Sequence, residues 1–452
     1  MEFIALDGTH SLVYFPGTYN FFKVNQLARD ALTALERADA DIGDRFSCTV
    51  IDRCAALLKA NTGPSEPVQA GPPEKRLSRL TLNVSGGCNL RCRYCYANAG
   101  DYKSKGRNMT TAAADRALSV FLDYFDKIDM IMFFGGEPLL NYPLIEYVCK
   151  KTIELTQNGR RKPLPQFAVI TNGTIYNAKI AEIFKTYHFA VTVSYDGDVA
   201  VNNKLRISQK GQGMSPVIID TIHKIIDETG IVPGIEGTYT RFHLEQGITP
   251  LHVVQNVKHI SDKLNLHLVP VMADPACSYA LPDYSPFVNS VSDFFSNIKS
   301  LSDYTQNPPL YSLLARLLTP LIYKEKPAVP YICNAGFGTL SVAADGSVYP
   351  CFMFIDTERF CLGNVFDTGM FNTERFKEMQ RAILAFSSKK SNPECKACFA
   401  RTVCSGCLGH ALNDTQCLKL DKKDCDLTRD MLKQTIIGLY HLMHKGAVQC
   451  TL

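Results

Sequence analysis

The stretch "GGCNLRCRYCYANAG", residues 86–100, decides the fold of this chain and much of its chemistry. It places Cys88, Cys92 and Cys95 in a loop directly after "LTLNVS", residues 80–85, an apolar segment of strand type. A closed structural metal site normally takes four protein ligands, and this loop supplies three. The spacing therefore predicts a metal site with one open position at the end of a buried strand.

Working outward from this loop, strand-type and helix-type segments alternate over residues 79–275. The strand candidates are "LTLNVS" (80–85), "MIMFF" (130–134), "FAVIT" (167–171), "AVTVSYD" (190–196), "GIEGTYT" (234–240) and "LHLVPVM" (266–272). This alternation predicts an α/β fold with a parallel sheet, and six repeats fit a partial (β/α)6 barrel of TIM type. Active groups on such a sheet gather at the C-terminal strand ends, where "GGEP" (135–138), "TNGT" (171–174) and "SYDGD" (194–198) are found.

The composition is that of an ordinary globular protein. The 452 residues suggest two or three domains, and 48 basic against 44 acidic residues leave a net charge of +4. This balance gives no electrostatic reason to expect a nucleic-acid or membrane partner. The chain lacks an apolar run long enough to span a bilayer, and "MEFIALDGTH" does not resemble a signal peptide, so we expect a cytoplasmic location.

The 17 cysteines are unusual for such a chain. Without an export signal, clustered cysteines indicate metal binding rather than disulfides. Nine of them lie between Cys333 and Cys425, including the run "CKACFARTVCSGC" at residues 395–407. This spacing is too tight for a zinc ribbon but suits iron–sulfur clusters. The remaining cysteines match no metal spacing and are expected to be structural: Cys48, Cys54, Cys149, Cys277 and Cys450.

The chain divides into three predicted domains: residues 1–70, 78–320 and 321–452. The first holds short strands in "EFIALDG" and "SLVYFPGTYNFFKVN", then a helix in "QLARDALTALERA", and the Pro- and Gly-rich segment 61–76 indicates a linker. A helical connector is expected near 286–325. The last domain has few long apolar elements before a closing helix at 427–445, so metal is expected to hold it together.

Three thiolates can hold three irons of a [4Fe–4S] cluster and leave the fourth iron free for an amino acid's amine and carboxylate. If that amino acid is the methionine half of S-adenosylmethionine (SAM), one electron can cleave its sulfonium and release a carbon radical. The motif "CNLRCRYC" indeed resembles the signature of the radical SAM superfamily. The resemblance implies these SAM-contacting residues: Tyr94, Gly135, Gly136, Glu137, Pro138, Asn172, Ser194 and Arg206. The alternative for the cysteine loop is a zinc site. The alternative for "GGEP", Asn172 and Ser194 is that they are turn or helix-cap residues, and Arg206 would then be a surface cation.

The second cysteine region resembles the SPASM extension of that superfamily, although the interval from Cys404 to Cys407 is one residue shorter than the usual pattern. The resemblance implies two auxiliary [4Fe–4S] clusters, hence three clusters in all. Auxiliary cluster I would take Cys333, Cys351 and Cys407, with Cys361 as its fourth ligand or an open site for a substrate thiolate. Auxiliary cluster II would take Cys395, Cys398, Cys404 and Cys425, with Cys417 as the alternative to Cys425.

The N-terminal region resembles the RiPP recognition element, a small winged-helix-like domain that binds leader peptides by strand addition. The alternative is a decoration that caps the barrel. Together the three parts resemble SPASM-type maturases that install thioether cross-links, as in sactipeptides and ranthipeptides. The implied partners are a cysteine-containing precursor peptide and an electron donor such as flavodoxin or ferredoxin. The rival functions are formylglycine formation as in an anaerobic sulfatase maturase, peptide epimerisation with Cys277 as a hydrogen donor, and a multi-cluster electron carrier.

Overall fold

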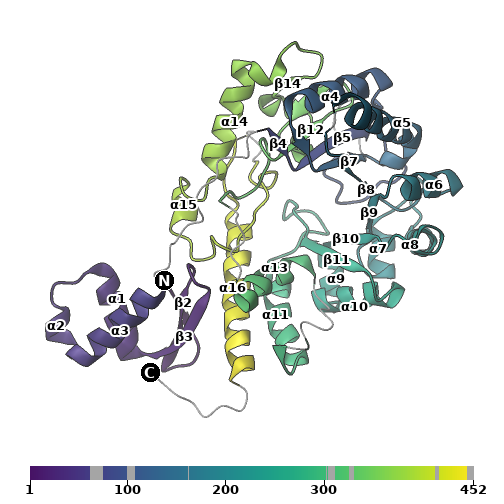
Figure 1. Cartoon of the computed structure of the whole chain (residues 1–452). Helices are drawn as coiled ribbons and strands as arrows, with labels where there is room; N and C mark the ends of the chain where they lie inside the picture. Colours follow the sequence, from purple (N-terminus) through teal and green to yellow (C-terminus); the bar gives the residue numbers. More distant parts are fainter. Residues whose placement is uncertain are drawn as a thin grey trace.

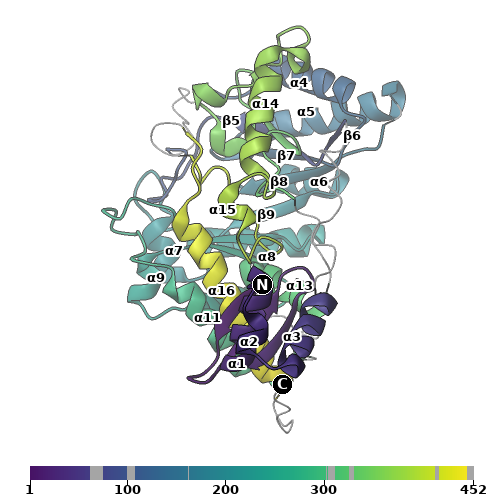
Figure 2. The same ribbon diagram turned by 90° about the vertical axis from the view of Figure 1, so that its left-hand side faces the viewer.

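The computed structural model describes residues 1–61, 75–98, 107–160, 162–301, 303, 311–324, 330–412 and 417–444. Most of the predicted linker 61–76 and Cys450 lie outside these residues. A curved central sheet carries helices along its outer side, and an N-terminal unit lies beside the long C-terminal helix (Figure 1; Figure 2). In both views this unit is remote from the helices α4 (Thr111–Tyr124) and α5 (Tyr142–Ile153).

Six parallel strands form the predicted partial barrel. They are β5 (Arg79–Ser85), β7 (Met130–Gly135), β8 (Gln166–Thr171), β9 (Ala190–Ser194), β10 (Gly234–Tyr239) and β11 (Asn265–Pro270). Each pairs with the next in chain order, and the sheet stays open rather than closing into a full barrel. All six strand predictions and the fold class are confirmed. A separate small pair, β4 (Arg76–Leu77) with β6 (Lys127–Ile128), was not predicted.

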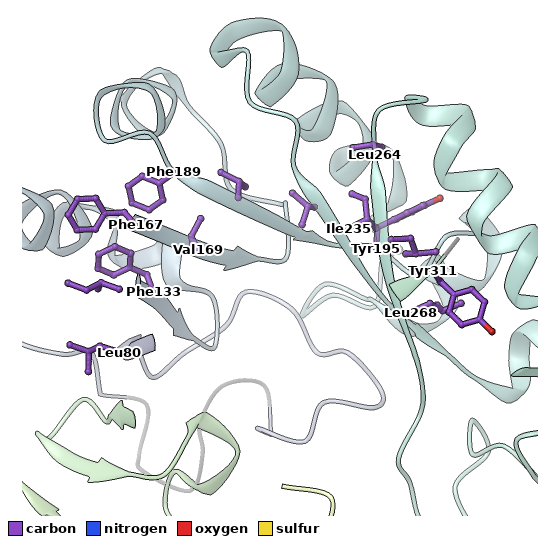
Figure 3. Packing of buried hydrophobic residues seen from close by; sticks show 14 of the residues in the cluster. Leu80, Phe133, Phe167, Val169, Phe189, Tyr195, Ile235, Leu264, Leu268 and Tyr311 are labelled. Atoms are coloured by element: carbon purple, nitrogen blue, oxygen red, sulfur yellow. The ribbon is translucent and has the colours of Figure 1, made fainter. Parts of the chain in front are cut away.

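Helices between the strands cover the outer face of the sheet (Figure 1). Besides α4 and α5 they are α6 (Ala178–Thr186), α7 (Val199–Leu205), α8 (Ser215–Thr229), α9 (Arg241–Glu245) and α10 (Pro250–Ile260). A short 3-10 helix η1 (Pro138–Asn141) precedes α5, and a π-helical segment η2 (Glu154–Arg160) continues it. Thr110 caps α4 by accepting a hydrogen bond from the Ala113 amide. Rings from adjacent strands stack in the core under these helices, Phe133 with Phe167 and Phe189 (Figure 3).

The N-terminal unit is a three-stranded antiparallel sheet, β1 (Glu2–Ala5), β2 (His10–Phe15) and β3 (Asn20–Asn25), with helices α1 (Gln26–Arg37), α2 (Ile42–Arg45) and α3 (Cys48–Asn61). The strands and the first helix were predicted. Side chains of β2 alternate between two apolar layers: Val13 and Phe15 face the unit's own helices, whereas Leu12 and Tyr14 join the main core. The unit is therefore packed onto the rest of the chain.

The C-terminal region extends the central sheet. Strand β12 (Thr339–Val342) pairs in parallel with β5, and β13 (Ser347–Tyr349) and β14 (Gly363–Asn364) follow as antiparallel neighbours. Short turns η3 (Phe352–Phe354), η4 (Glu358–Phe360) and η5 (Met370–Asn372) come next. The region also forms two helices that were not predicted, α14 (Glu374–Ser387) and α15 (Pro393–Lys396). Phe376 of α14 is buried in the main core, and Ile383 is buried in the cluster of apolar side chains that contains Cys351.

Three further helices join the parts. The predicted connector contains α11 (Ser285–Asn297) and α13 (Ser312–Tyr323), and the closing helix α16 (Lys422–Met443) begins five residues earlier than predicted. Helix α16 packs on both α11 and α13, while α13 packs on β11. Within the part of the chain that the structure describes, none of the helices is long and apolar enough to cross a membrane.

Candidate active site

The three-cysteine loop follows β5 at the C-terminal edge of the sheet, and a strap from the segment after α7 holds it. The Arg91 amide donates to Ile207 O at 2.8 Å, and the Arg93 amide donates to Leu205 O at 3.0 Å. Gln209 Nε2 also donates to Cys88 O at 3.3 Å. The loop is thus fixed by backbone groups some 110 residues away in the chain, a tie that local sequence patterns do not reveal.

A second tie joins the loop to the end of β8. Asn172 Nδ2 donates to Asn89 Oδ1 at 2.9 Å and lies 3.6 Å from the Cys88 Sγ. Asn89 Nδ2 in turn donates to Thr174 Oγ1 at 2.8 Å. The structure therefore brings Asn172, one of the residues expected near the cofactor, next to the first cysteine of the loop.

The "GGEP" segment begins where β7 ends, and its first glycine is required by geometry. Gly135 has φ +144°, and a Cβ built there would lie 2.2 Å from Ser85 O. The amide of Gly136 donates to the same carbonyl at 2.9 Å. Strands β5 and β7 therefore approach so closely at this point that only glycine fits. Pro138 follows as the first residue of η1 and is buried.

Glu137 is fully buried and joins β7 to β8. Its Oε1 accepts from the Leu139 amide at 3.0 Å and from Thr171 Oγ1 at 2.8 Å, and its Oε2 accepts from the Asn172 amide at 2.7 Å. Burial raises the pKa of this carboxyl to about 7, while the three donors act in the opposite direction. The Glu137 side chain thus ties the C-terminal ends of β7 and β8 together inside the protein. Only the backbone of this residue is available to a bound ligand.

A buried carboxylate, Asp196, connects two residues that were expected to contact SAM. The Tyr94 hydroxyl donates to both of its oxygens, at 2.8 and 2.7 Å. Arg206 Nε and Nη2 donate to it at 3.2 and 3.3 Å, and the Thr238 amide donates at 3.0 Å. Burial lowers the pKa of Arg206, but the Asp196 charge outweighs this effect and the net pKa lies above its ordinary value.

The backbone carbonyl of Asp196 is also held, by the side chain of His243. His243 Nδ1 accepts from the Thr240 amide at 3.0 Å, so its Nε2 carries the proton and donates to Asp196 O at 2.9 Å. Burial lowers the pKa of His243 and keeps the ring neutral. Neither Asp196 nor His243 was predicted from the sequence as a site residue. The first lies inside the "SYDGD" motif, of which only Ser194, at the last position of β9, was selected.

The thiols of the loop lie in a protein environment that favours their neutral forms when no metal is bound. Burial raises the pKa of Cys88 to about 11 and that of Cys92 to about 12, and in both cases the neighbouring cysteines of the loop raise it further. Metal binding at these sulfurs must therefore displace protons. Cys95 packs, together with Phe134, against the cluster of apolar side chains that contains Cys351. The loop thus adjoins the C-terminal cysteine region.

Three C-terminal cysteines form a set that we call thiol set I. Its members are Cys333, Cys351 and Cys407. Burial raises the pKa of Cys351, and the charges of the Cys407 and Cys333 thiols act in the same direction. Cys351 lies in a cluster of buried apolar side chains against which Cys333 also packs. Cys361 directs its thiol to Gly363 O, with an Sγ–O distance of 3.5 Å, although it packs on the same apolar cluster.

Four other cysteines form thiol set II. Its members are Cys395, Cys398, Cys404 and Cys425. Burial raises the pKa of Cys425 to about 12, and the other three thiols add to this effect. Cys425 reaches this set because it lies on the first turn of α16. Cys417, its alternative, instead accepts a hydrogen bond from Arg359 Nη1 at 3.0 Å.

The donor atoms present are suited to iron–sulfur clusters and to SAM. In the described ranges, no group of three or more His, Cys, Asp or Glu side chains converges on the position of one metal ion. Each proposed set offers three or four thiols, the number of protein ligands that a cluster of several iron atoms takes. Asn83 Oδ1, beside Gly135, is buried and has no hydrogen-bond partner among the described residues, so an acceptor is available for an amine at "GGEP".

Comparisons with known proteins identify the class. Residues 82–234 match the model of the radical SAM superfamily, and residues 333–399 match that of SPASM, an iron–sulfur cluster-binding domain. The chain is therefore a radical SAM enzyme that carries a SPASM domain. Iron–sulfur clusters and SAM are the cofactors of this class.

Several known proteins are similar in sequence to this chain. An uncharacterized protein, MJ0907 of Methanocaldococcus jannaschii, is 36% identical over 146 residues, which are 32% of this chain and 46% of that protein. A cysteine-type anaerobic sulfatase-maturating enzyme of Clostridium novyi is 25% identical over 354 residues, 74% of this chain and 88% of the enzyme. The antilisterial bacteriocin subtilosin biosynthesis protein AlbA of Bacillus subtilis is 23% identical over 348 residues, 74% of this chain and 68% of AlbA.

Two solved structures share the fold. The structure titled native anSMEcpe with bound AdoMet and Cp18Cys peptide has a TM-score of 0.64 at 20% identity, covering 82% of this chain and 98% of that one. Streptococcus suis SuiB bound to the precursor peptide SuiA has a TM-score of 0.51 at 14% identity, covering 90% of this chain and 94% of SuiB.

Proposed function

We propose that this enzyme is a peptide maturase that forms thioether cross-links, from a cysteine sulfur to a carbon, in a ribosomally made precursor. The observation that carries the proposal is the combination of three separate thiol sets with an N-terminal sheet packed on the same body. The relatives AlbA and the sulfatase-maturating enzyme support a protein or peptide substrate.

Each thiol set is proposed to hold one [4Fe–4S] cluster, three in all. Cys88, Cys92 and Cys95 hold the cluster that binds SAM, and sets I and II hold the auxiliary clusters. When bound and reduced, the first cluster and SAM supply a carbon radical able to remove a hydrogen atom from the peptide. A flavodoxin- or ferredoxin-type protein is the proposed electron source.

The residues around the loop are proposed to bind and orient SAM. Arg206 uses Nε and Nη2 on Asp196, so its Nη1 is the group offered to the SAM carboxylate. Tyr94, with its hydroxyl fixed by Asp196, presents its ring to the adenine. Asn172 and Ser194 end neighbouring strands on the same side and are proposed ribose contacts. The "GGEP" backbone receives the methionyl amine.

Set I supplies three thiols, so its cluster is proposed to keep one iron available for the thiolate of the substrate cysteine. Iron binding would deprotonate that cysteine and hold its sulfur near the acceptor carbon, from which the SAM-derived radical would remove one hydrogen atom. When the C–S bond forms, the surplus electron would pass to the auxiliary cluster, so each cross-link loses one hydrogen atom, one proton and one electron. Cys361 packs on the same apolar cluster and is the competing fourth ligand. Replacement of Cys361 by alanine distinguishes the two arrangements, because an open site retains its iron in the variant.

The N-terminal unit is proposed to bind the leader of the precursor. In the sheet order β1-β2-β3, β1 and β3 are the edges, and an edge strand can accept a peptide strand by backbone hydrogen bonds. The unit is fixed to the C-terminal region by Tyr14, whose ring packs edge-on against Phe399 at 6.5 Å. Lys324 Nζ also donates to Tyr19 O at 2.7 Å, so a bound leader would extend from a defined position.

Anaerobic coexpression with a cysteine-containing precursor peptide, sought among the short reading frames beside the gene, tests the proposal. A thioether product has lost two hydrogens per cross-link and no longer reacts with iodoacetamide at the linked cysteine. The Cys92→Ser variant is the control and leaves the peptide unchanged. A product with all its thiols free and its mass unchanged would refute thioether formation.

Formylglycine formation is the second candidate, favoured by the similarity to the Clostridium novyi enzyme across 88% of its length. Its product carries an aldehyde that reacts with hydrazine probes and has lost the cysteine sulfur. Epimerisation, with Cys277 as donor, leaves the mass unchanged in water and adds one deuterium in D2O. An electron carrier would release no 5′-deoxyadenosine from SAM with reductant, whereas all three enzymes release it.

A further inference from the structure

Two cations are positioned beside thiol set II, and the first is Lys389. This residue follows α14 and is only 5% exposed. Its Nζ donates to Arg401 O at 2.9 Å and to the carbonyl of Cys404. Both acceptors are neutral, so a buried ammonium is placed against the backbone of a set II cysteine, and no carboxylate among the described residues pairs with it.

The second cation, Arg316, approaches from a different element, α13. Its Nη1 donates to the hydroxyl of Ser405, the residue after Cys404. Its Nε is buried and has no hydrogen-bond partner among the described residues. Arg316 as a whole is half-buried, and a guanidinium whose buried Nε has no partner is costly unless negative charge lies nearby. Its contact with Ser405 places this guanidinium beside the backbone of a set II cysteine.

Most other charges near set II are paired or exposed, while the half-buried Arg401 donates from Nη1 to Lys396 O at 2.8 Å. Arg429 pairs with Asp426 on the surface of α16 and also interacts with Cys398. Asp424 pairs with His410, with an Nδ1–Oδ2 distance of 2.9 Å. Glu394 is exposed. Set I, by comparison, has Arg79 near Cys351.

We propose that Lys389 and Arg316 are positioning residues that compensate the charge of the cluster on set II and raise its reduction potential. An iron–sulfur cluster gains one negative charge on one-electron reduction, so nearby buried cations stabilise the reduced form. The cluster on set II would then accept an electron more readily than it would with neutral residues in these places. This inference rests on the ligand set proposed above for that cluster.

Potentiometric titration followed by electron paramagnetic resonance tests this role in the full-length reconstituted protein. Replacing Cys88, Cys92 and Cys95 by alanine leaves only the auxiliary signals. In this background we expect Lys389→Met and Arg316→Met each to make reduction of the set II cluster about tenfold less favourable, a midpoint about 59 mV more negative. The set I signal serves as the internal reference. Lys390→Met, which removes an exposed charge next in sequence, is the matched control.

The outcomes separate charge compensation from a purely structural role. Lys389→Arg keeps the charge and should retain a potential near that of the parent protein. If both methionine variants hold the set II cluster at its parent potential, the proposal is overturned. Loss of iron without a shift in the remaining cluster assigns Lys389 to loop structure and also overturns it. If the parent protein shows no cluster on set II, the ligand assignment fails together with the inference, independently of whether the peptide product forms.

Discussion

Replacement of Asp196 by asparagine tests the central network of the site. The change removes a carboxylate that is fully buried and accepts from Tyr94, Arg206 and the Thr238 amide. It leaves the Arg206 guanidinium, which is 7% exposed, without its counter-ion and turns an amide N–H₂ toward it. Breaking a buried ion pair from one side costs about 3–5 kcal/mol. We therefore expect Asp196→Asn to lower the free energy of unfolding by about that amount.

The matched control is Asp220→Asn. Asp220 Oδ2 lies 2.7 Å from Lys224 Nζ, but the two side chains are 59% and 50% exposed. An exposed pair of this kind contributes about 0.2–1 kcal/mol. Urea denaturation of the metal-free proteins under reducing conditions, followed by circular dichroism, gives both differences under the same conditions.

A double-mutant cycle with Arg206→Met isolates the pair itself, and the double variant should be more stable than the sum of the single changes implies. Equal costs for Asp196→Asn and Asp220→Asn would refute the reasoning, because they would mean that Asp196 is hydrated or that Arg206 finds another anion. The same result would remove the basis for treating Tyr94 and Arg206 as parts of one held unit.

Three further predictions follow from other parts of the site. Gly135→Ala should lower the free energy of unfolding by about 1–3 kcal/mol through strain at its positive φ. Gly87→Ala, where a Cβ meets open space, should change it by less than about 0.5 kcal/mol. Similar urea midpoints for the two variants would contradict this prediction. Cys425→Ala should lose about four irons per chain and Cys417→Ala none, and iron analysis giving the reverse would overturn the ligand set. Folding raises the pKa of Glu137 from 4.5 to about 7, so its contribution to stability is complete below about pH 4.5 and is lost as the pH rises to 7. The free energy of unfolding should therefore fall by roughly 3 kcal/mol over this range, and Glu137→Gln should abolish the fall. The same pH profile in the variant and the parent protein would disprove this.

The sheet could be predicted from the sequence because each strand is a short apolar run followed by a distinctive polar motif. Burial on both faces of a parallel sheet produces such runs, and they can be recognised without tertiary information. The N-terminal unit was harder. Both faces of β2 are apolar, so its pattern did not reveal that Leu12 and Tyr14 pack on another part of the chain.

The network around Asp196 could not be predicted because its members are distant in sequence. The hydrogen bond between Tyr94 and Asp196 spans 102 positions, and only the packing of the loop after α7 brings them together. The grouping of cysteines has the same origin. Spacing alone left Cys417 and Cys425 as alternatives. Cys425 lies on the first turn of α16, whereas Cys417 accepts a hydrogen bond from Arg359, and neither fact could be read from the spacing.

The measurement that tests the central claim most directly is electron nuclear double resonance on the reduced enzyme with SAM labelled by ¹⁵N at its amine. The account predicts a nitrogen coupling to the cluster held by Cys88, Cys92 and Cys95, and loss of that coupling in the Cys92→Ser variant. A reduced cluster at this loop that shows no coupling to the labelled amine would contradict the claim that one of its irons is kept open for SAM.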